Sequence, residues 1–262
     1  APSNGAKGVG FTEAPDKKYT DLLKANGYDV TRFITTGTPD VNVLNAADLV
    51  IIGRSVNSGH YSNAAATTWN GVSAPMIIMG GYTMRKNRMG FTTGNTIPDT
   101  TADVALTVSD PNHPIFAGIP LLDGTMVNPY AGIAIYPTDG TTKARGISIN
   151  TDPLNGGGIA LATVSAAGTP AGGTVIAEWP AGATLTHDGG AGTDVLAGPR
   201  LALLSGAREA SGKSSETAGM YDLYADGEQM FLNAVKYMIP EPDTTLLANG
   251  GFEDGVLEPW TT

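Results

Sequence analysis

The stretches DLVIIGRSVNSGHY (residues 48–61) and APMIIMGGYTMRKNR (residues 74–88) decide the fold of this chain. Each contains a short apolar run, Leu49–Ile52 and Met76–Met79, that breaks at once into glycine and polar residues. Short continuous apolar runs are typical of strands buried on both faces of a parallel sheet. Ligands of open α/β sheets bind just beyond the carboxyl ends of such strands, so we expect any functional site in the residues that follow them.

The candidate ligand-binding residues lie in these two polar segments, and they are Arg54, Ser55, His60, Tyr82, Arg85 and Arg88. Guanidinium groups recognise carboxylate or phosphate with two parallel hydrogen bonds, so the three arginines predict a site for an acidic sugar. The alternative is that each arginine pairs with an acidic side chain or a carbonyl and only orders its loop.

No catalytic residue is assigned. Ser55 nearly matches the nucleophile of a G-x-S-x-G elbow, but Asn57 stands where the second glycine belongs. An elbow also needs a helix that begins at the serine, and here the helical pattern starts only near Asn63. A hydrogen-bonding loop serine is the favoured interpretation.

Strand-like and helix-like segments alternate over the first part of the chain. The alternation predicts a parallel sheet with right-handed crossovers. The expected strands are Val9–Phe11, Tyr28–Ile34, Leu49–Ile52 and Met76–Met79, and the expected helices are 15–25, 41–46 and 63–69.

Residues 103–180 have a different pattern, in which Gly, Pro and Thr separate short β-prone runs. This pattern predicts an antiparallel, β-rich extension of the parallel sheet. Its expected strands are 104–108, 132–136, 146–149, 159–163 and 174–179. Beyond the extension, Arg200–Leu204 predicts one more buried strand, and 227–239 predicts a helix capped by Asp226 and ended by Pro240.

These patterns divide the chain into two parts. Residues 1–240 form one α/β domain that contains the β-rich insertion at 103–180. Residues 241–262 are expected to be a linker followed by the first strand of a truncated module.

The bulk composition excludes several classes of protein. The net charge of −10 argues against nucleic acid and anionic membranes as partners, and no apolar run is long enough to span a bilayer. The chain has no cysteine, which removes disulfides, thiolate metal sites and a cysteine nucleophile. Only 15% of the residues are charged, and the start APSNGAKG is typical of an end left by a signal peptidase. The low charged fraction and this start together predict a secreted protein in an extracellular or cell-surface location.

The first 240 residues resemble the class I glutamine-amidotransferase-like superfamily, and within it the ThuA-like branch found in large exported bacterial proteins. The resemblance rests on the two opening stretches, on HPIFAGI (113–119) and on GEQMFLNAVKYMI (227–239). It implies a flavodoxin-like, mainly parallel sheet flanked by helices. Catalytic members carry a cysteine on a sharp turn after a central strand. Because this chain has Gly80-Gly81-Tyr82 at that turn and no cysteine, amidotransferase chemistry is excluded.

The end of the chain resembles the opening strand of β-sandwich carbohydrate-binding modules, through NGGFEDG at 249–255. In that family an early acidic residue helps to hold a structural calcium ion, and Glu253 would correspond to it. Asp188 and Asp194 flank a second loop with oxygen ligands for calcium, for which a solvated turn is the alternative. No other cofactor is expected.

The sequence therefore predicts a non-catalytic domain for ligand binding, spacing or assembly in a bacterial multidomain protein associated with carbohydrate. Its expected partner is a polysaccharide or an acidic sugar. One alternative is a carbohydrate-active hydrolase that uses the cleft at the strand ends. Another is a structural subunit that self-associates through residues 244–262.

Overall fold

The computed structural model describes residues 14–34, 37–100, 104–130, 133–135, 142–144, 146–189, 192–208 and 219–239. The expected strand Val9–Phe11 and the segment 241–262, which includes Glu253, lie outside the described residues.

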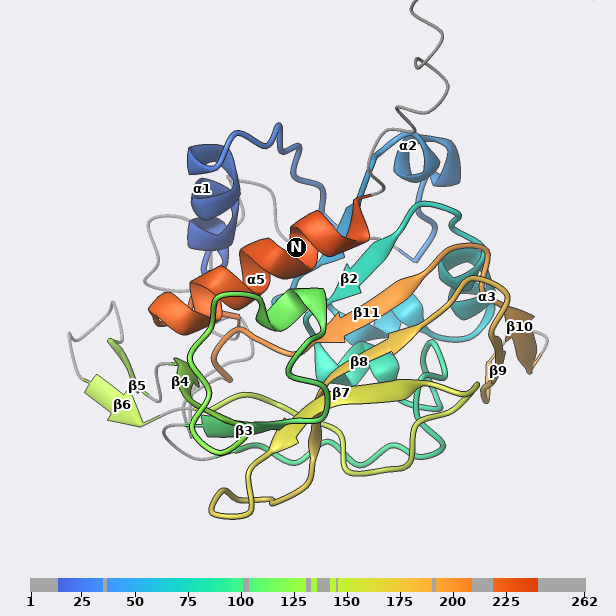
Figure 1. Ribbon diagram of the computed structural model, residues 1–262. Coiled ribbons are helices and arrows are strands. Elements are labelled where there is room, and N and C mark those ends of the chain that lie inside the picture. The colour runs from blue at the N-terminus through green and yellow to red at the C-terminus, as the bar shows by residue number, and fades with distance from the viewer. Residues whose placement is uncertain are drawn as a thin grey trace, which may run out of the picture.

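A seven-stranded sheet in the order β1-β2-β11-β8-β7-β3-β4 forms the centre of the described structure (Figure 1). Its parallel part consists of β1 (Val50–Ile52), β2 (Met76–Ile78) and β11 (Arg200–Leu203). All residues of β2 and β11 are buried, as the apolar runs MII of β2 and LAL of β11 predict.

The antiparallel extension continues this same sheet from β11 outward. It comprises β8 (Thr174–Trp179), β7 (Ile159–Val164), β3 (Val104–Val108) and β4 (Thr125–Tyr130). Two small hairpins lie apart from it, β5 (Ile133–Ile135) with β6 (Thr142–Ala144), and β9 (Thr184–Thr186) with β10 (Thr193–Val195). The predicted fold class, α/β with an antiparallel β-rich extension, is confirmed.

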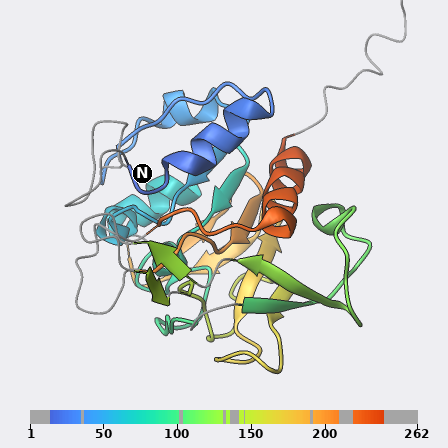
Figure 2. The ribbon, with the colours of Figure 1, turned by 90° about the vertical axis from the view of Figure 1, so that its left-hand side faces the viewer.

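Helices cover both faces of the sheet. Figures 1 and 2 show α5 (Ala225–Met238) across one face and α3 (Ala64–Asn70) on the opposite face. The other helical elements are α1 (Lys17–Ala25), α2 (Val41–Asn45) and α4 (Gly81–Met84), with the 3-10 turns η1 (Ser58–Tyr61) and η2 (Pro114–Phe116). None of the helices described is both long enough and apolar enough to cross a lipid bilayer.

Three local predictions were wrong. Residues 28–34 are not a strand, because they have no hydrogen-bonded neighbour strand among the described residues. The stretch 146–149 makes only isolated bridges, such as Asp99 with Ser148, in place of a continuous ladder. Helix α5 starts two residues earlier than predicted, so Asp226 lies in its first turn and Tyr224 takes the N-cap position.

Candidate arginine site at the carboxyl ends of β1 and β2

Arg54 follows directly after β1 and is nearly buried, with an exposed fraction of 9%. Its guanidinium lies 4.9 Å from the centroid of the Tyr82 ring, and its Nη2 donates to Ser148 Oγ at 3.2 Å. Ser148 Oγ in turn donates to Asp99 Oδ1 at 2.7 Å. Arg54 therefore connects the end of β1 to the antiparallel half of the molecule through a buried polar chain.

Helix α4 begins immediately beyond β2 and brings Tyr82 beside Arg54. A Cβ atom at Gly81 would lie 2.9 Å from the Ser148 carbonyl oxygen, so this close approach requires glycine. The Arg85 guanidinium lies 5.1 Å from the same Tyr82 centroid. Tyr82 thus contacts two arginine side chains, an arrangement stabilised by cation–π attraction.

Arg85 and Arg88 converge on one hydroxyl group. Arg85 Nη2 donates to Ser58 Oγ at 3.3 Å, and Arg88 Nε donates to the same oxygen at 3.4 Å. Their other hydrogen bonds go to backbone carbonyls, those of Tyr82 and Asn87. Within the described part of the chain, neither arginine forms an ion pair with a carboxylate. Partial burial, and next the charge of Arg88, lower the pKa of the Arg85 guanidinium.

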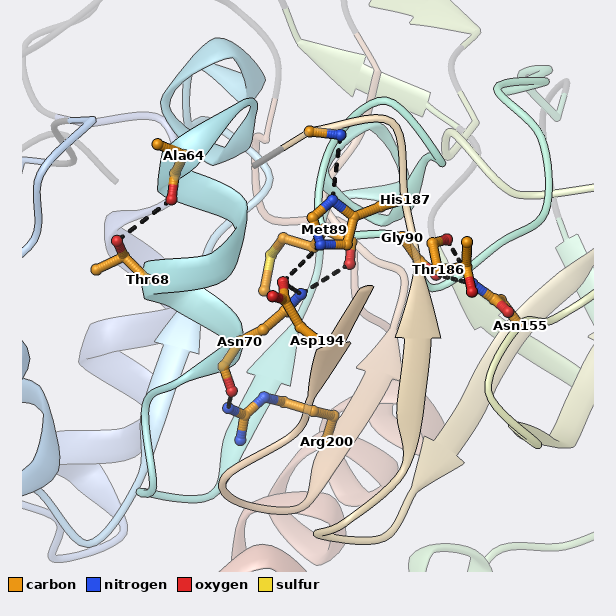
Figure 3. A network of polar contacts seen from close by, with 11 residues as sticks. Ala64, Thr68, Asn70, Met89, Gly90, Asn155, Thr186, His187, Asp194 and Arg200 are labelled. Carbon is orange, nitrogen blue, oxygen red and sulfur yellow. Dashed lines mark hydrogen bonds and ion pairs between the residues drawn. The ribbon is translucent and has the colours of Figure 1, made fainter. Parts of the chain in front are cut away.

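A buried network positions the loop that carries these arginines (Figure 3). Asn70 Nδ2 donates to the Met89 carbonyl and to Asp194 Oδ2, each at 3.0 Å. Gly189 N–H donates to His187 Nδ1 at 3.2 Å, so Nε2 of His187 carries the proton that it shares with Asp194 Oδ2 at 2.5 Å. The network joins α3, the β9–β10 hairpin and residues 85–89, which we call the arginine loop. The imidazole of His187 within it is fully buried.

Of the predicted residues, Ser55 forms its side-chain hydrogen bond outside this cluster. Ser55 Oγ donates to Asp16 Oδ2 at 2.7 Å, near the start of α1. Its partner among the described contacts is thus a carboxylate, whereas a hydrolase serine needs a histidine base. His60 lies in η1, where its carbonyl accepts a hydrogen bond from Trp69 Nε1 at 3.1 Å.

The two described calcium candidates already have protein partners. Asp188 forms an ion pair with Lys86 at 3.1 Å, and Asp194 is held by His187 and Asn70. No group of three or more potential metal ligands occurs among the residues that the structure places. A calcium site therefore stays a prediction from the sequence.

A second polar cluster, not predicted from the sequence, lies at the end of β11. Asp222 Oδ1 accepts hydrogen bonds from Tyr19 Oη at 2.7 Å, Ser205 Oγ at 3.1 Å and Gly206 N–H at 3.0 Å. Burial raises the pKa of Asp222 to about 6, although these hydrogen bonds oppose the rise. The side chains of Asp222, Tyr19 and Ser205 are each at least 95% buried, so they do not form a surface that a substrate can reach.

The geometry thus selects Tyr82, Arg85 and Arg88 as the accessible part of the site, with Arg54 as its buried support. Two guanidinium groups that share a hydroxyl and have no carboxylate partner can hold a carboxylate or phosphate. The sequence analysis missed Ser58, because a serine among glycine and asparagine carries no distinguishing signal.

No protein-family model matches the chain, and no curated protein matches its sequence. Two solved structures have a similar fold. Cytoplasmic Protein STM3548 from Salmonella typhimurium is 10% identical with a TM-score of 0.51, and the match covers 85% of this chain and 86% of that one. Cytoplasmic Protein STM1381 from Salmonella typhimurium LT2 is 10% identical with a TM-score of 0.50, and the match covers 87% and 89%.

At this identity the two neighbours show the fold alone, and the ThuA-like resemblance stays a prediction. Both neighbours are described as cytoplasmic proteins, which contradicts the prediction of a secreted, extracellular protein. That prediction is withdrawn. It rested on the low fraction of charged residues and on the segment APSNGAKG, and neither feature is specific to one compartment.

Proposed function

We propose that this chain is a non-catalytic ligand-binding domain that holds the carboxylate of an acidic sugar at Arg85 and Arg88. The observation that carries the proposal is the convergence of these two guanidinium groups on Ser58 Oγ without a carboxylate partner among the described residues. The alternative from the sequence was that each arginine pairs with an acidic side chain or a carbonyl and only orders its loop. Both arginines do bond backbone carbonyls, but each also donates to Ser58 Oγ, and none of their described contacts is to a carboxylate.

The electrostatics favour an anion at this position. Partial burial, and next the repulsion from the like charge of Arg88, lower the pKa of the Arg85 guanidinium. A bound carboxylate offsets both the partial burial of the Arg85 charge and its repulsion by Arg88. It also accepts the charge-assisted hydrogen bonds that Ser58 now receives. The chain carries a net charge of −10, so such a cationic site stands out locally against an acidic surface.

The site is preorganised, which supports binding. Tyr82 orients Arg85, and the Lys86–Asp188 ion pair together with the Asn70–Met89 hydrogen bond holds the arginine loop against the β9–β10 side of the molecule. Rigid side chains lose less conformational entropy when a ligand binds.

A calorimetric or NMR titration tests the proposal. We expect oligomers of an acidic sugar such as glucuronate to bind, while a neutral glucose oligomer of equal length does not. The double substitution Arg85→Gln and Arg88→Gln should weaken binding at least tenfold. Lys24→Gln removes one positive charge from the exposed surface of α1 and serves as the control, which should bind as the unchanged chain does.

Equal binding by the double variant and the unchanged chain would refute this assignment. Tight binding of inorganic phosphate with no binding of the acidic sugar would retain an anion site and reject the sugar. Release of reducing sugar that depends on Arg85 would instead favour the hydrolase.

A further inference from the structure

The hydroxyl group of Ser58 has positively charged neighbours. Its Oγ accepts hydrogen bonds from the guanidinium groups of Arg85, at 3.3 Å, and Arg88, at 3.4 Å. Three other serines instead donate their hydroxyl to a carboxylate, and they are Ser55, Ser148 and Ser205. A negative charge added to Ser58 would therefore be attracted by its neighbours, whereas the same charge on the other three serines would be repelled.

The two hydrogen bonds to Ser58 are long for bonds from a charged donor. N–H···O bonds from a guanidinium to an ionised oxygen are typically about 2.7–2.9 Å. Because the Ser58 hydroxyl is neutral, it accepts both bonds without offsetting either positive charge. A phosphate monoester carries up to two negative charges and three acceptor oxygens at neutral pH, which matches two guanidinium groups in charge and in hydrogen bonding.

Ser58 lies in a segment that a modifying enzyme can reach. Its side chain is partly exposed, and its neighbours Asn57 and Gly59 are exposed. The backbone of Ser58 belongs to η1, a single 3-10 turn of four residues. Since short 3-10 turns have poor hydrogen-bond geometry, this turn opens at a low cost when an enzyme binds the segment in an extended conformation.

We propose that Ser58 is a phosphorylation site, and that its phosphate occupies the site at Arg85 and Arg88 and excludes the acidic sugar. A separate serine kinase transfers the γ-phosphoryl group of ATP to Ser58. A bond forms between Ser58 Oγ and the γ-phosphorus, and the bond from that phosphorus to the β,γ-bridging oxygen breaks. The hydroxyl proton passes to a base of the kinase, and ADP leaves.

A phosphate on Ser58 has two advantages over a free sugar at the same arginines. It carries more negative charge than a carboxylate. It is also tethered beside both guanidinium groups, so its effective concentration there is on the order of millimolar or higher. The exclusion of the sugar rests on the proposed function, whereas the contact between the phosphate and the arginines does not.

Phosphorus NMR of the full chain carrying Ser58→phosphoserine tests that contact. Adding Arg85→Gln and Arg88→Gln should raise the pKa of the phosphate by at least about one unit, because the guanidinium groups favour the dianion. Ser109→phosphoserine places the same group on an exposed serine and is the control, whose pKa the double substitution should leave unchanged. If the double variant does not fold, Arg88→Gln alone should raise the pKa by at least about half a unit.

Two further measurements test the modification and its effect. Ser58→phosphoserine should weaken the binding of a glucuronate oligomer at least tenfold, while Ser109→phosphoserine should bind the oligomer as the unmodified chain does. Mass spectrometry of the protein isolated from the cells that make it should locate a phosphate on Ser58.

A phosphate pKa at position 58 that does not respond to loss of the arginines overturns the proposal. A protein that carries no phosphate on Ser58 in its own cells also overturns it. Unchanged sugar binding after Ser58→phosphoserine refutes the exclusion. If the unmodified chain binds no acidic sugar, the proposed function fails and the exclusion with it, and the pKa comparison still decides whether the arginines hold the phosphate.

Discussion

Asp222 shows how one residue can set the pH dependence of the whole fold. Its carboxylate is buried beside two tyrosines, and burial together with this charge raises the pKa of both Tyr19 and Tyr130. Burial raises the pKa of Asp222 itself to about 6, from 3.8. Because the folded protein binds this proton more tightly than the unfolded chain, the contribution of Asp222 to stability is greatest below pH 4 and is lost as the pH rises through 6.

We predict that Asp222 lowers the free energy of unfolding by about 3 kcal/mol between pH 4 and pH 7, since a tenfold change in proton affinity corresponds to about 1.4 kcal/mol. Asp222→Asn keeps an acceptor for Tyr19 and Gly206 and should abolish this decline. Urea unfolding at several pH values measures this change in the free energy of unfolding. The exposed Asp123→Asn is the control, and parallel pH profiles for Asp222→Asn and the unchanged chain would contradict the prediction.

At the scale of elements, Arg200 joins the first residue of β11 to the end of α3. Its fully buried guanidinium donates to the carbonyls of Ala74, Pro199, Asn70, Val72 and Trp69. Burial lowers its pKa to about 10. Trp69 and Asn70 end α3, where free carbonyls and the negative end of the helix dipole favour a cation. One arginine thus replaces the water that these carbonyls would otherwise need.

Arg200→Met should cost at least about 3 kcal/mol of unfolding free energy, because the substitution leaves several buried carbonyls without a donor. Chemical denaturation measures the loss. Lys24→Met, which removes an exposed charge from α1, should change stability by less than about 0.5 kcal/mol. A stable Arg200→Met protein would mean that the carbonyls find other donors.

At the scale of the whole molecule, one sheet passes through both the parallel and the antiparallel parts. β11 pairs with β2 on one side and with β8 on the other, so the 103–180 insertion shares a core with the rest of the domain. Since neither part buries its strands without the other, we expect them to unfold together.

The fully buried Ile176 of β8 tests this cooperativity. Ile176→Ala should lower stability by about 2–5 kcal/mol and shift the whole transition, so that circular dichroism and tryptophan fluorescence remain coincident. Ile159→Ala in β7, which is 55% exposed, should have little effect. Two separate transitions would show that the insertion folds on its own.

The strands that the sequence predicted best are those with the clearest pattern of apolar residues. β2, β8 and β11 each contain a short apolar run, and their observed bounds differ from the predicted ones by at most one residue. β4 was missed because TMVNPY contains a proline, and β9 and β10 because three residues carry too little periodicity.

For the candidate site, the position of Arg54, Tyr82, Arg85 and Arg88 beyond two adjacent strands followed from the sequence, because parallel strands end at the same edge of a sheet. Sequence alone determined this local order, the α/β class and the absence of cysteine chemistry. Only the tertiary structure decided which groups meet: Ser58 between two arginines, Asp222 with Tyr19, and Arg200 at the end of α3. Such contacts join residues up to 203 positions apart, and no local pattern encodes a pairing that chain folding creates.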